Sequence, residues 1–328
     1  MAAELSTLMI ERAAAADARR VLRMALADGR RTAAALEAHV TGFLAYAQEM
    51  GLDLSRQWLA TRDGRMMGGC LWIESPGRTA LLLLPNSATM PGGAVVSAAL
   101  VHRALSEAAG SAITMAQCLI DPADARSRAV LSEASFEEIA VLIYLECVVG
   151  DAATYGHPQE VEAMEQRTSW QLYDAASHGE FAELVMETYE GSQDCPKLSG
   201  LREIDDILAG HRAAGRFDPR RWLLARLDGR AAGCILLSEN PLRPALEVTY
   251  MGVAPHARGQ GIGGLLLRRA LAEAYLSGFQ RLTLAVDSEN APAMHLYRSF
   301  GFFETARQRA MIRRMKDRGH AFSSLRHD

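Results

Sequence analysis

The order of apolar and polar positions along the chain predicts alternating strands and helices. Residues 245–253 (ALEVTYMGV) are rich in β-forming side chains, and Pro255 ends that run. In 265–278 (LLLRRALAEAYLSG), leucine and alanine recur every three to four positions up to a closing glycine, as in an amphipathic helix. A continuous apolar run at 139–149 (IAVLIYLECVV) indicates another buried strand. The pattern therefore predicts an α/β chain.

The two halves of the sequence resemble each other. Residues 56–72 and 220–236 both read as a strand, an Asp-Gly-Arg turn and a second strand that carries Gly-Cys. Farther along, 101–140 aligns with 267–306 at an offset of 166 residues. So long a period indicates duplicated domains. The alternative is chance similarity between two amphipathic segments.

Each half runs strand, helices, hairpin, long strand, helix, strand, helix, strand. Such an order predicts a mixed, mostly antiparallel sheet flanked by helices. The polar segment 151–167 between the halves is interpreted as a linker. We therefore expect a first domain at 1–150, a linker at 151–167 and a second domain at 168–328.

Composition excludes several classes of protein. The chain has 328 residues, of which 49% are hydrophobic and 23% charged, as is typical of soluble globular proteins. A net charge of −4 gives no electrostatic argument for a nucleic-acid partner. The longest apolar stretch, 94–110, is interrupted by charges and too short to span a bilayer, so no membrane partner is expected.

Cysteine and histidine usage points to a metal-free protein in a reducing compartment. The five cysteines are widely spaced and form no Cys-x-x-Cys pair, which argues against a disulfide framework or a zinc ribbon. The nine histidines show no metal-ligand spacing. The N-terminal residues lack the apolar core of a signal peptide. We expect no metal and a cytoplasmic location.

Four glycines stand where the strand at 245–253 leads into the helix at 265–278. Gly259, Gly261, Gly263 and Gly264 allow successive backbone N–H groups to converge at a helix N-terminus, whose partial charge is positive. Such a nest favours phosphate. The alternative is a merely flexible connection, which would need fewer glycines.

Two other phosphate motifs compete for this loop. A Walker A loop requires Gly-Lys-Ser/Thr at its end, whereas Gly264 is followed by three leucines. A dinucleotide fingerprint is satisfied literally by Gly-x-Gly-x-x-Gly, with Asp287 where a ribose-binding acid could stand. Four residues (APHA) separate that loop from its strand, and only 41 residues follow Asp287, too few for the remaining βαβ units.

Three motifs together resemble the GCN5-related N-acetyltransferase (GNAT) superfamily. Residues 258–263 (RGQGIG) fit its Arg/Gln-x-x-Gly-x-Gly/Ala signature, and 247–255 and 290–302 are similar to its strand and terminal motifs. The resemblance covers 168–316 well and 1–150 in outline. It implies two tandem GNAT-like domains, a layout similar to that of the mycothiol synthase family.

The resemblance implies acetyl-CoA as cosubstrate. The pantetheine would pair with the edge of the strand at 245–253, and the pyrophosphate would lie on the glycine loop. The residues expected to hold the cosubstrate are Met251, Gly252, Val253, Arg258, Gly259, Gln260, Gly261, Ile262, Gly263, Gly264 and Asn290.

Acetyl transfer to an amine needs a base and an acid. A free alkyl ammonium has a pKa of about 10 and is almost fully protonated at pH 7. The resemblance implies Glu247 as the base and Tyr297 as the acid that protonates the departing thiolate. Asn290 is expected to cap the helix carrying Tyr297, and their seven-residue spacing puts both on one side of it. The alternatives are a packing role for Tyr297 and a solvent-facing edge position for Glu247.

The region after the first helix of the second domain is expected to cover the acceptor cleft. Asp194 could hold a cationic amine there, although a solvated loop is the alternative. Tyr250 is a second candidate for acceptor binding, and simple alternation puts it on the strand face opposite Glu247. The expected acceptor is a small-molecule amine, with a protein N-terminus as a further possibility.

The first half lacks the residues that carry this chemistry. At the offset of 166, the glycine loop aligns with 92–97 (GGAVVS), Tyr297 with Leu131 and Asn290 with Asp124. The first domain is therefore expected to be degenerate and to shape the acceptor cleft. The sequence predicts an acetyl-CoA-dependent N-acetyltransferase acting through a ternary complex. The alternative is a non-catalytic acyl-CoA sensor or scaffold.

Overall fold

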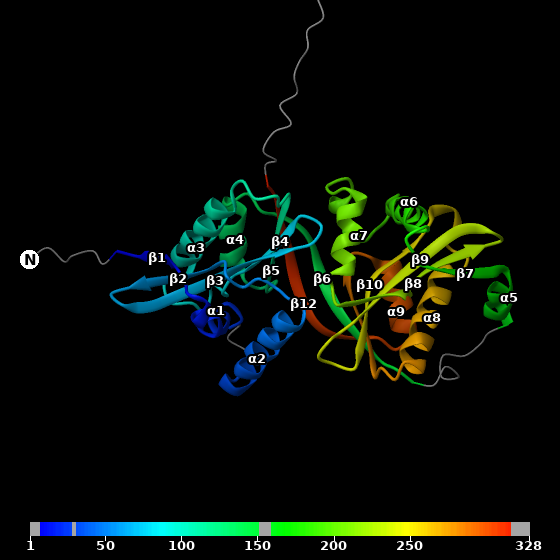
Figure 1. Ribbon diagram of the computed structural model, residues 1–328, viewed down its shortest axis with the longest axis horizontal. Coiled ribbons are helices and arrows are strands. Elements are labelled where there is room, and N and C mark those ends of the chain that lie inside the picture. Colours follow the sequence, from blue (N-terminus) through cyan, green and yellow to red (C-terminus); the bar gives the residue numbers. More distant parts are fainter. Residues whose placement is uncertain (1–6, 28–30, 151–158, 316–328) are drawn as a thin grey trace, which may run out of the picture. The chain divides into compact units, whose positions relative to one another are not determined.

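The computed structural model describes residues 7–27, 31–150 and 159–315 (Figure 1). It divides into two compact units, each an α/β structure. Unit 1 comprises Met1–Glu138 and Ala310–Asp328, and unit 2 comprises Ile139–Arg309.

Unit 1 is built around the strand order β1-β2-β3-β4-β5-β12. Strands β4 and β5 pair in parallel, whereas β1, β2, β3 and β4 pair in succession as antiparallel neighbours. Its elements are β1 (Met9–Arg12), α1 (Ala18–Ala25), α2 (Ala33–Glu49), β2 (Gln57–Arg62), β3 (Arg65–Ser75), β4 (Thr79–Leu83), α3 (Gly93–Ala108), β5 (Met115–Ile120) and α4 (Ala125–Glu133).

Unit 2 has the strand order β12-β6-β11-β10-β9-β8-β7. Strands β10 and β11 pair in parallel, whereas β6 with β11, β10 with β9, β9 with β8 and β8 with β7 pair antiparallel. Its elements are β6 (Glu137–Val148), α5 (Gln159–Arg167), β7 (Thr168–Leu172), α6 (His178–Tyr189), α7 (Ile204–Arg212), β8 (Arg216–Leu227), β9 (Arg230–Glu239), β10 (Ala245–Val253), α8 (Ile262–Leu276), β11 (Arg281–Asp287), α9 (Ala291–Ser299) and β12 (Phe303–Arg314).

The two predicted Asp-Gly turns are confirmed. Asp63 and Gly64 join β2 to β3 with φ of 51° and 69°, and Asp228 and Gly229 join β8 to β9 with φ of 50° and 83°. Positive φ at both central residues matches the right-handed twist of the flanking strands, which is why this dipeptide is favoured in hairpins.

Side-chain alternation places helices on both faces of the unit 2 sheet (Figure 1). Ile235 and Leu237 of β9 pack with α8 and α9, whereas Cys234 and Leu236 pack with α6 and α7. The two faces bury different side chains of the same strand because successive side chains point to opposite sides. Cys234 and its counterpart in the first repeat, Cys70 of unit 1, are both fully buried.

The unit boundaries differ from the expected domains at 1–150 and 168–328. Strand β6 pairs with β11 from Leu142↔Asp287 to Val148↔Arg281, so most of β6 belongs to unit 2. The last five residues of β12, Ala310–Arg314, belong to unit 1. The expected linker at 151–167 contains helix α5; its residues 151–158 lie outside the described ranges.

Candidate active site

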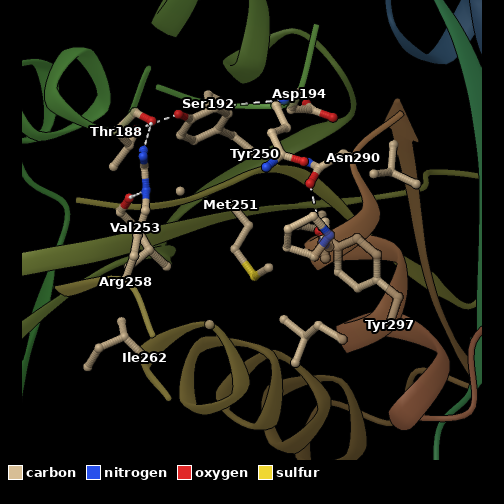
Figure 2. Close-up of a pocket in the computed structure, with 18 of the residues that line it drawn as sticks. Thr188, Ser192, Asp194, Tyr250, Met251, Val253, Arg258, Ile262, Asn290 and Tyr297 are labelled. Carbon is tan, nitrogen blue, oxygen red and sulfur yellow. Dashed lines mark hydrogen bonds between the residues drawn. The ribbon is translucent and has the colours of Figure 1, made fainter. Parts of the chain in front are cut away.

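A pocket of about 640 Å³ opens in unit 2 between β10, the N-terminus of α8, α9 and the loop after α6 (Figure 2). Met251 and Tyr297 both point toward its middle. All but one of the eleven residues expected to hold the cosubstrate line it, together with both candidate acceptor residues and the expected acid: Met251, Gly252, Val253, Arg258, Gly259, Gly261, Ile262, Gly263, Gly264, Asn290, Asp194, Tyr250 and Tyr297.

The glycines of the loop are required for different structural reasons. Gly259 and Gly261 have φ of 75° and 87°, and a Cβ added at either would meet open space. Gly261 is the N-cap of α8, and no side chain caps that helix end. Gly263 instead permits close packing, because a Cβ there would lie 3.2 Å from Leu296 of α9. The first N–H groups of α8 are therefore available to an anion in the pocket.

Arg258 and Gln260 brace the loop through backbone carbonyls. The Arg258 guanidinium donates to the carbonyl oxygens of Val253 at 3.2 Å and of Thr188 at 2.9 Å (Figure 2). The Gln260 amide donates to the His256 carbonyl at 2.9 Å, and Gln260 is not among the pocket-lining residues. This hydrogen bond turns the Gln260 amide nitrogen toward its own loop.

Strand β10 presents an unpaired edge to the pocket. Its pairing with β11 ends at Val248↔Leu284, whereas its pairing with β9 continues to Val253↔Gly233. The pocket lies along the segment where β10 and β11 separate. An extended chain with amide groups could add there as a further strand, so this edge fits a pantetheine arm.

A β-bulge at Thr249 changes the predicted orientation of Tyr250. Val248 pairs with Leu237 but Tyr250 pairs with Leu236, so one residue of β10 is left over. Glu247 pairs with Ser238, which lies on the same sheet face as Leu236. Glu247 and Tyr250 therefore share a face, and the expectation from simple alternation was wrong.

Tyr250 is held at the unpaired edge of β10 by Thr188. Their hydroxyl oxygens lie 2.5 Å apart, and Thr188 also donates to the Val185 carbonyl (Figure 2). A Cβ at Gly252 would come within 2.6 Å of the Thr188 hydroxyl and 2.9 Å of the Tyr250 hydroxyl. Sequence reasoning missed Thr188, whose place one residue before the end of α6 carries no motif.

Glu247 is half-buried on the face that it shares with Tyr250. Burial raises its pKa from 4.5 to about 7, since desolvation disfavours the charged carboxylate. Across β11, burial and the Glu247 charge raise the pKa of Tyr144 to about 12. Glu247 does not line the pocket. Thr249 of β10 and Ala285 of β11, which lie where these two strands separate, do line it.

Asn290 and Tyr297 lie as the spacing predicts. Asn290 is the N-cap of α9 and accepts a hydrogen bond from the Ala293 N–H at 3.3 Å (Figure 2). Tyr297 is 6% exposed, and burial together with the Asp194 charge raises its pKa. A buried phenol of this kind remains protonated at neutral pH.

Asp194 ties the loop after α6 to the end of β11. Its carboxylate accepts from the Asp287 N–H at 3.0 Å, and the Asp287 carboxylate accepts from the Cys195 N–H at 3.1 Å. The Asn290 side chain also hydrogen-bonds Asp194. Desolvation raises the pKa of Asp194 despite these contacts. Asp194 thus shapes the pocket as well as lining it.

The corresponding region of unit 1 is filled. Helix α3 also begins at a left-handed glycine, Gly92, with φ of 79°. Gly92 and Gly261 correspond because each is the N-cap of its helix. The offset of 166 instead aligned Gly92 with Arg258, three residues before Gly261. Here Ser87 is fully buried, and its hydroxyl lies 2.7 Å from Ser97 and 2.8 Å from Ser127.

The helix that follows in unit 1 has an acidic cap. Asp124, the N-cap of α4, accepts from the Ser87 N–H at 3.0 Å and the Ser127 N–H at 2.9 Å. Leu131 is fully buried in the core. Protein groups therefore occupy the hydrogen-bonding positions around Ser87 and the start of α4, and the cap carries a carboxyl group where unit 2 has the Asn290 amide.

Across residues 7–27, 31–150 and 159–315, no cluster of three or more His, Cys, Asp or Glu side chains is arranged to hold a metal ion. Within the same ranges, no helix has the combined length and hydropathy that a membrane crossing requires.

Comparison with known proteins gave related sequences and folds. Residues 180–302 match the acetyltransferase (GNAT) family. The mycothiol acetyltransferase of Clavibacter michiganensis subsp. michiganensis (strain NCPPB 382) is 27% identical over 245 residues, which cover 74% of this chain and 75% of that protein.

Two solved structures share the architecture. A GCN5-related N-acetyltransferase from Sphaerobacter thermophilus has a TM-score of 0.63 at 19% identity and covers 94% of this chain and 95% of its own. A tandem GNAT protein from the clavulanic acid biosynthesis pathway has a TM-score of 0.54 at 18% identity, with coverage of 94% and 98%. These likenesses confirm the predicted fold class.

Proposed function

Because this chain is a tandem acetyltransferase of the GNAT superfamily, we propose that unit 2 transfers the acetyl group of acetyl-CoA to the primary amine of a small molecule. Cosubstrate and acceptor would be bound together in a ternary complex, with Glu247 as the base and Tyr297 as the acid.

The observation that carries the proposal is the pocket between β10 and α8. An uncapped helix N-terminus with two left-handed glycines meets the unpaired edge of Thr249–Val253 there. The first feature suits a pyrophosphate and the second suits the amides of pantetheine. Tyr297 lines the same pocket from α9, where its hydroxyl could meet the sulfur.

Each catalytic residue has the protonation behaviour that its role needs. With a pKa near 7, Glu247 is partly ionised at neutral pH and can accept a proton from the acceptor ammonium, directly or through water. Tyr297 has a raised pKa and stays protonated until the thiolate departs. Bound acetyl-CoA would supply the activated acyl group, and the chain would supply orientation and proton transfer.

The Clavibacter relative is a mycothiol acetyltransferase, which supports a small-molecule acceptor for this chain. An amine library, screened with acetyl-CoA by following free thiol, tests the proposal and would identify the acceptor class. Thiol release that no amine of the library accelerates would contradict it and would favour an acyl-CoA sensor.

Substitution of the N-cap glycine should weaken the cosubstrate complex. Gly261→Asp introduces a carboxylate where the pyrophosphate is expected, and loss of about 1.4 kcal/mol or more would lower acetyl-CoA affinity about tenfold or more. Calorimetric titration measures this change.

Gly278→Asp is the matched control for that variant. Gly278 follows the C-terminal end of the same helix, has φ of 76° and also faces open space. The backbone strain should be similar, with no effect on acetyl-CoA binding. Equal affinities in Gly261→Asp and Gly278→Asp would remove the pyrophosphate assignment.

We expect one acetyl-CoA per chain. In unit 1 the buried Ser87 network packs against an acidic cap, Asp124, where unit 2 has the Asn290 amide, and a carboxylate there would repel a pyrophosphate. The molar ratio in the calorimetric titration measures this directly. Two equivalents in the wild type, one of which persists in Gly261→Asp, would mean that unit 1 also binds the cosubstrate.

A further inference from the structure

The sheet face that carries Glu247 continues across two more strands of unit 2. Glu247 pairs with Thr283 of β11, and two residues farther along β11 Ala285 pairs with Tyr144 of β6. Paired residues share a face, and residues two apart on one strand do so as well. Glu247, Thr283, Ala285 and Tyr144 therefore form one strip.

The side chains in the middle of this strip are small. Thr283 and Ala285 are small, and Ala285 is exposed and lines the pocket. Glu247 on β10 and Tyr144 on β6 therefore stand on either side of two small residues of β11, and Glu146 of β6 lies beside Thr283. An acceptor whose amine lies beside Glu247 would extend over β11 toward Tyr144.

The Tyr144 hydroxyl is fixed in place and retains hydrogen-bonding capacity. It donates to Oε1 of Gln308 at 2.8 Å, and the backbone carbonyl of Tyr144 accepts from the Thr305 hydroxyl at 3.2 Å. A phenolic oxygen that has used its proton can still accept a hydrogen bond. Tyr144 thus offers an acceptor atom to a hydroxyl or N–H group of a ligand.

The neighbouring acidic group on this face is already neutralised. Glu146, which pairs with Thr283, lies 3.4 Å from both Arg243 and Arg281. Its side chain is only 14% exposed. The charge available to a cationic amine is therefore that of Glu247. Of the two neutral polar groups on the strip, the Thr283 hydroxyl donates its proton to the Leu246 carbonyl at 3.3 Å, and the Tyr144 phenol stands at the far end.

We propose that Tyr144 determines acceptor specificity by accepting a hydrogen bond from a hydroxyl group that the acceptor carries a few bonds from its amine. The inference rests on the proposed function and adds a substrate class, hydroxylated primary amines. Tyr144 contributes to binding of the acceptor and not to proton transfer, since it lies at the opposite end of the strip from Glu247.

A matched pair of probes tests this assignment. 2-Amino-1,3-propanediol and isopropylamine have the same carbon skeleton and differ by two hydroxyl groups. At saturating acetyl-CoA, the wild type should have the higher kcat/KM for the diol. Tyr144→Phe keeps the ring but removes the acceptor atom, so the ratio of the two kcat/KM values should fall about fivefold, mainly through KM for the diol.

Comparison of ratios cancels the intrinsic difference in amine basicity. Tyr275→Phe, at a half-exposed position on α8, is the control and should leave the ratio unchanged. An unchanged ratio in Tyr144→Phe, or a wild type that acetylates other amines but not the diol, would overturn this inference and leave the proposed function standing. A wild type that acetylates no amine of the library would overturn the proposed function itself.

Discussion

Glu247→Gln should lower the rate of amine acetylation by about 10²–10⁴-fold, the range that general-base catalysis supplies. Gln cannot accept the proton of the acceptor ammonium, yet it preserves the size and polarity of the side chain. Affinity for acetyl-CoA should be unchanged, because Glu247 is outside the set of residues that line the pocket where we propose that acetyl-CoA binds. Steady-state kinetics and calorimetry measure the two effects separately.

The pH dependence of the wild type provides an independent check on the base. As pH rises through about 7, Glu247 loses its proton and becomes able to act, so kcat should rise with a midpoint near that value. The rising limb should be absent in Glu247→Gln. A variant that keeps both the rate and the rising limb would contradict the assignment.

The ionisation of Glu247 that should raise kcat should lower the stability of the fold. Between pH 4.5 and about 7 the folded state retains a proton that the unfolded chain has released, so stability falls as pH rises through this window, and the full penalty is present above pH 7. The penalty is at most about 3 kcal/mol by linkage. Glu247→Gln avoids it, so the gain in Tm over the wild type should be larger at pH 8 than at pH 5.

Tyr297→Phe should lower turnover about 10²-fold with little change in acetyl-CoA affinity or Tm. The ring remains packed at 5.7 Å from that of Phe302, so only the hydroxyl and its proton are lost. Rapid quench or steady-state assays of thiol release measure the effect. The decrease should shrink for an acyl donor whose leaving thiol has a lower pKa, since such a thiolate needs less protonation.

Two results would argue against that role. Near-normal turnover in Tyr297→Phe would mean that water or another group protonates the thiolate. A large loss of Tm would indicate that Tyr297 is chiefly a packing residue. Tyr275→Phe, remote from the pocket on α8, shows what removal of a tyrosine hydroxyl costs in itself.

Local chemistry made much of the site predictable. The Asp-Gly turns need positive φ at two positions, Asn290 caps a helix with its own side chain, and the loop glycines adopt φ values that other residues resist. Each of these preferences acts over a few residues, so a short motif is enough to reveal it.

Features that depend on distant partners were not predictable in this way. The bulge at Thr249 appears only when β10 is paired with β9, and it reverses the face on which Tyr250 lies. Strand β6 reads as the end of the first repeat but pairs with β11. Side-chain alternation gives the faces of a regular strand, and pairing decides where the regularity is interrupted.

The path of β12 also determines when unit 1 can be completed during synthesis of the chain. Synthesis proceeds from the N-terminus, yet Ala310–Arg314 complete the unit 1 sheet beside β5, and Met311 is buried in its core. Unit 1 on the ribosome therefore keeps an open strand edge and an unfilled core position until all of unit 2 has been translated. For the same reason, a fragment that begins at Thr168 would lack β6 and leave β11 exposed, so a working second half has to begin before that strand.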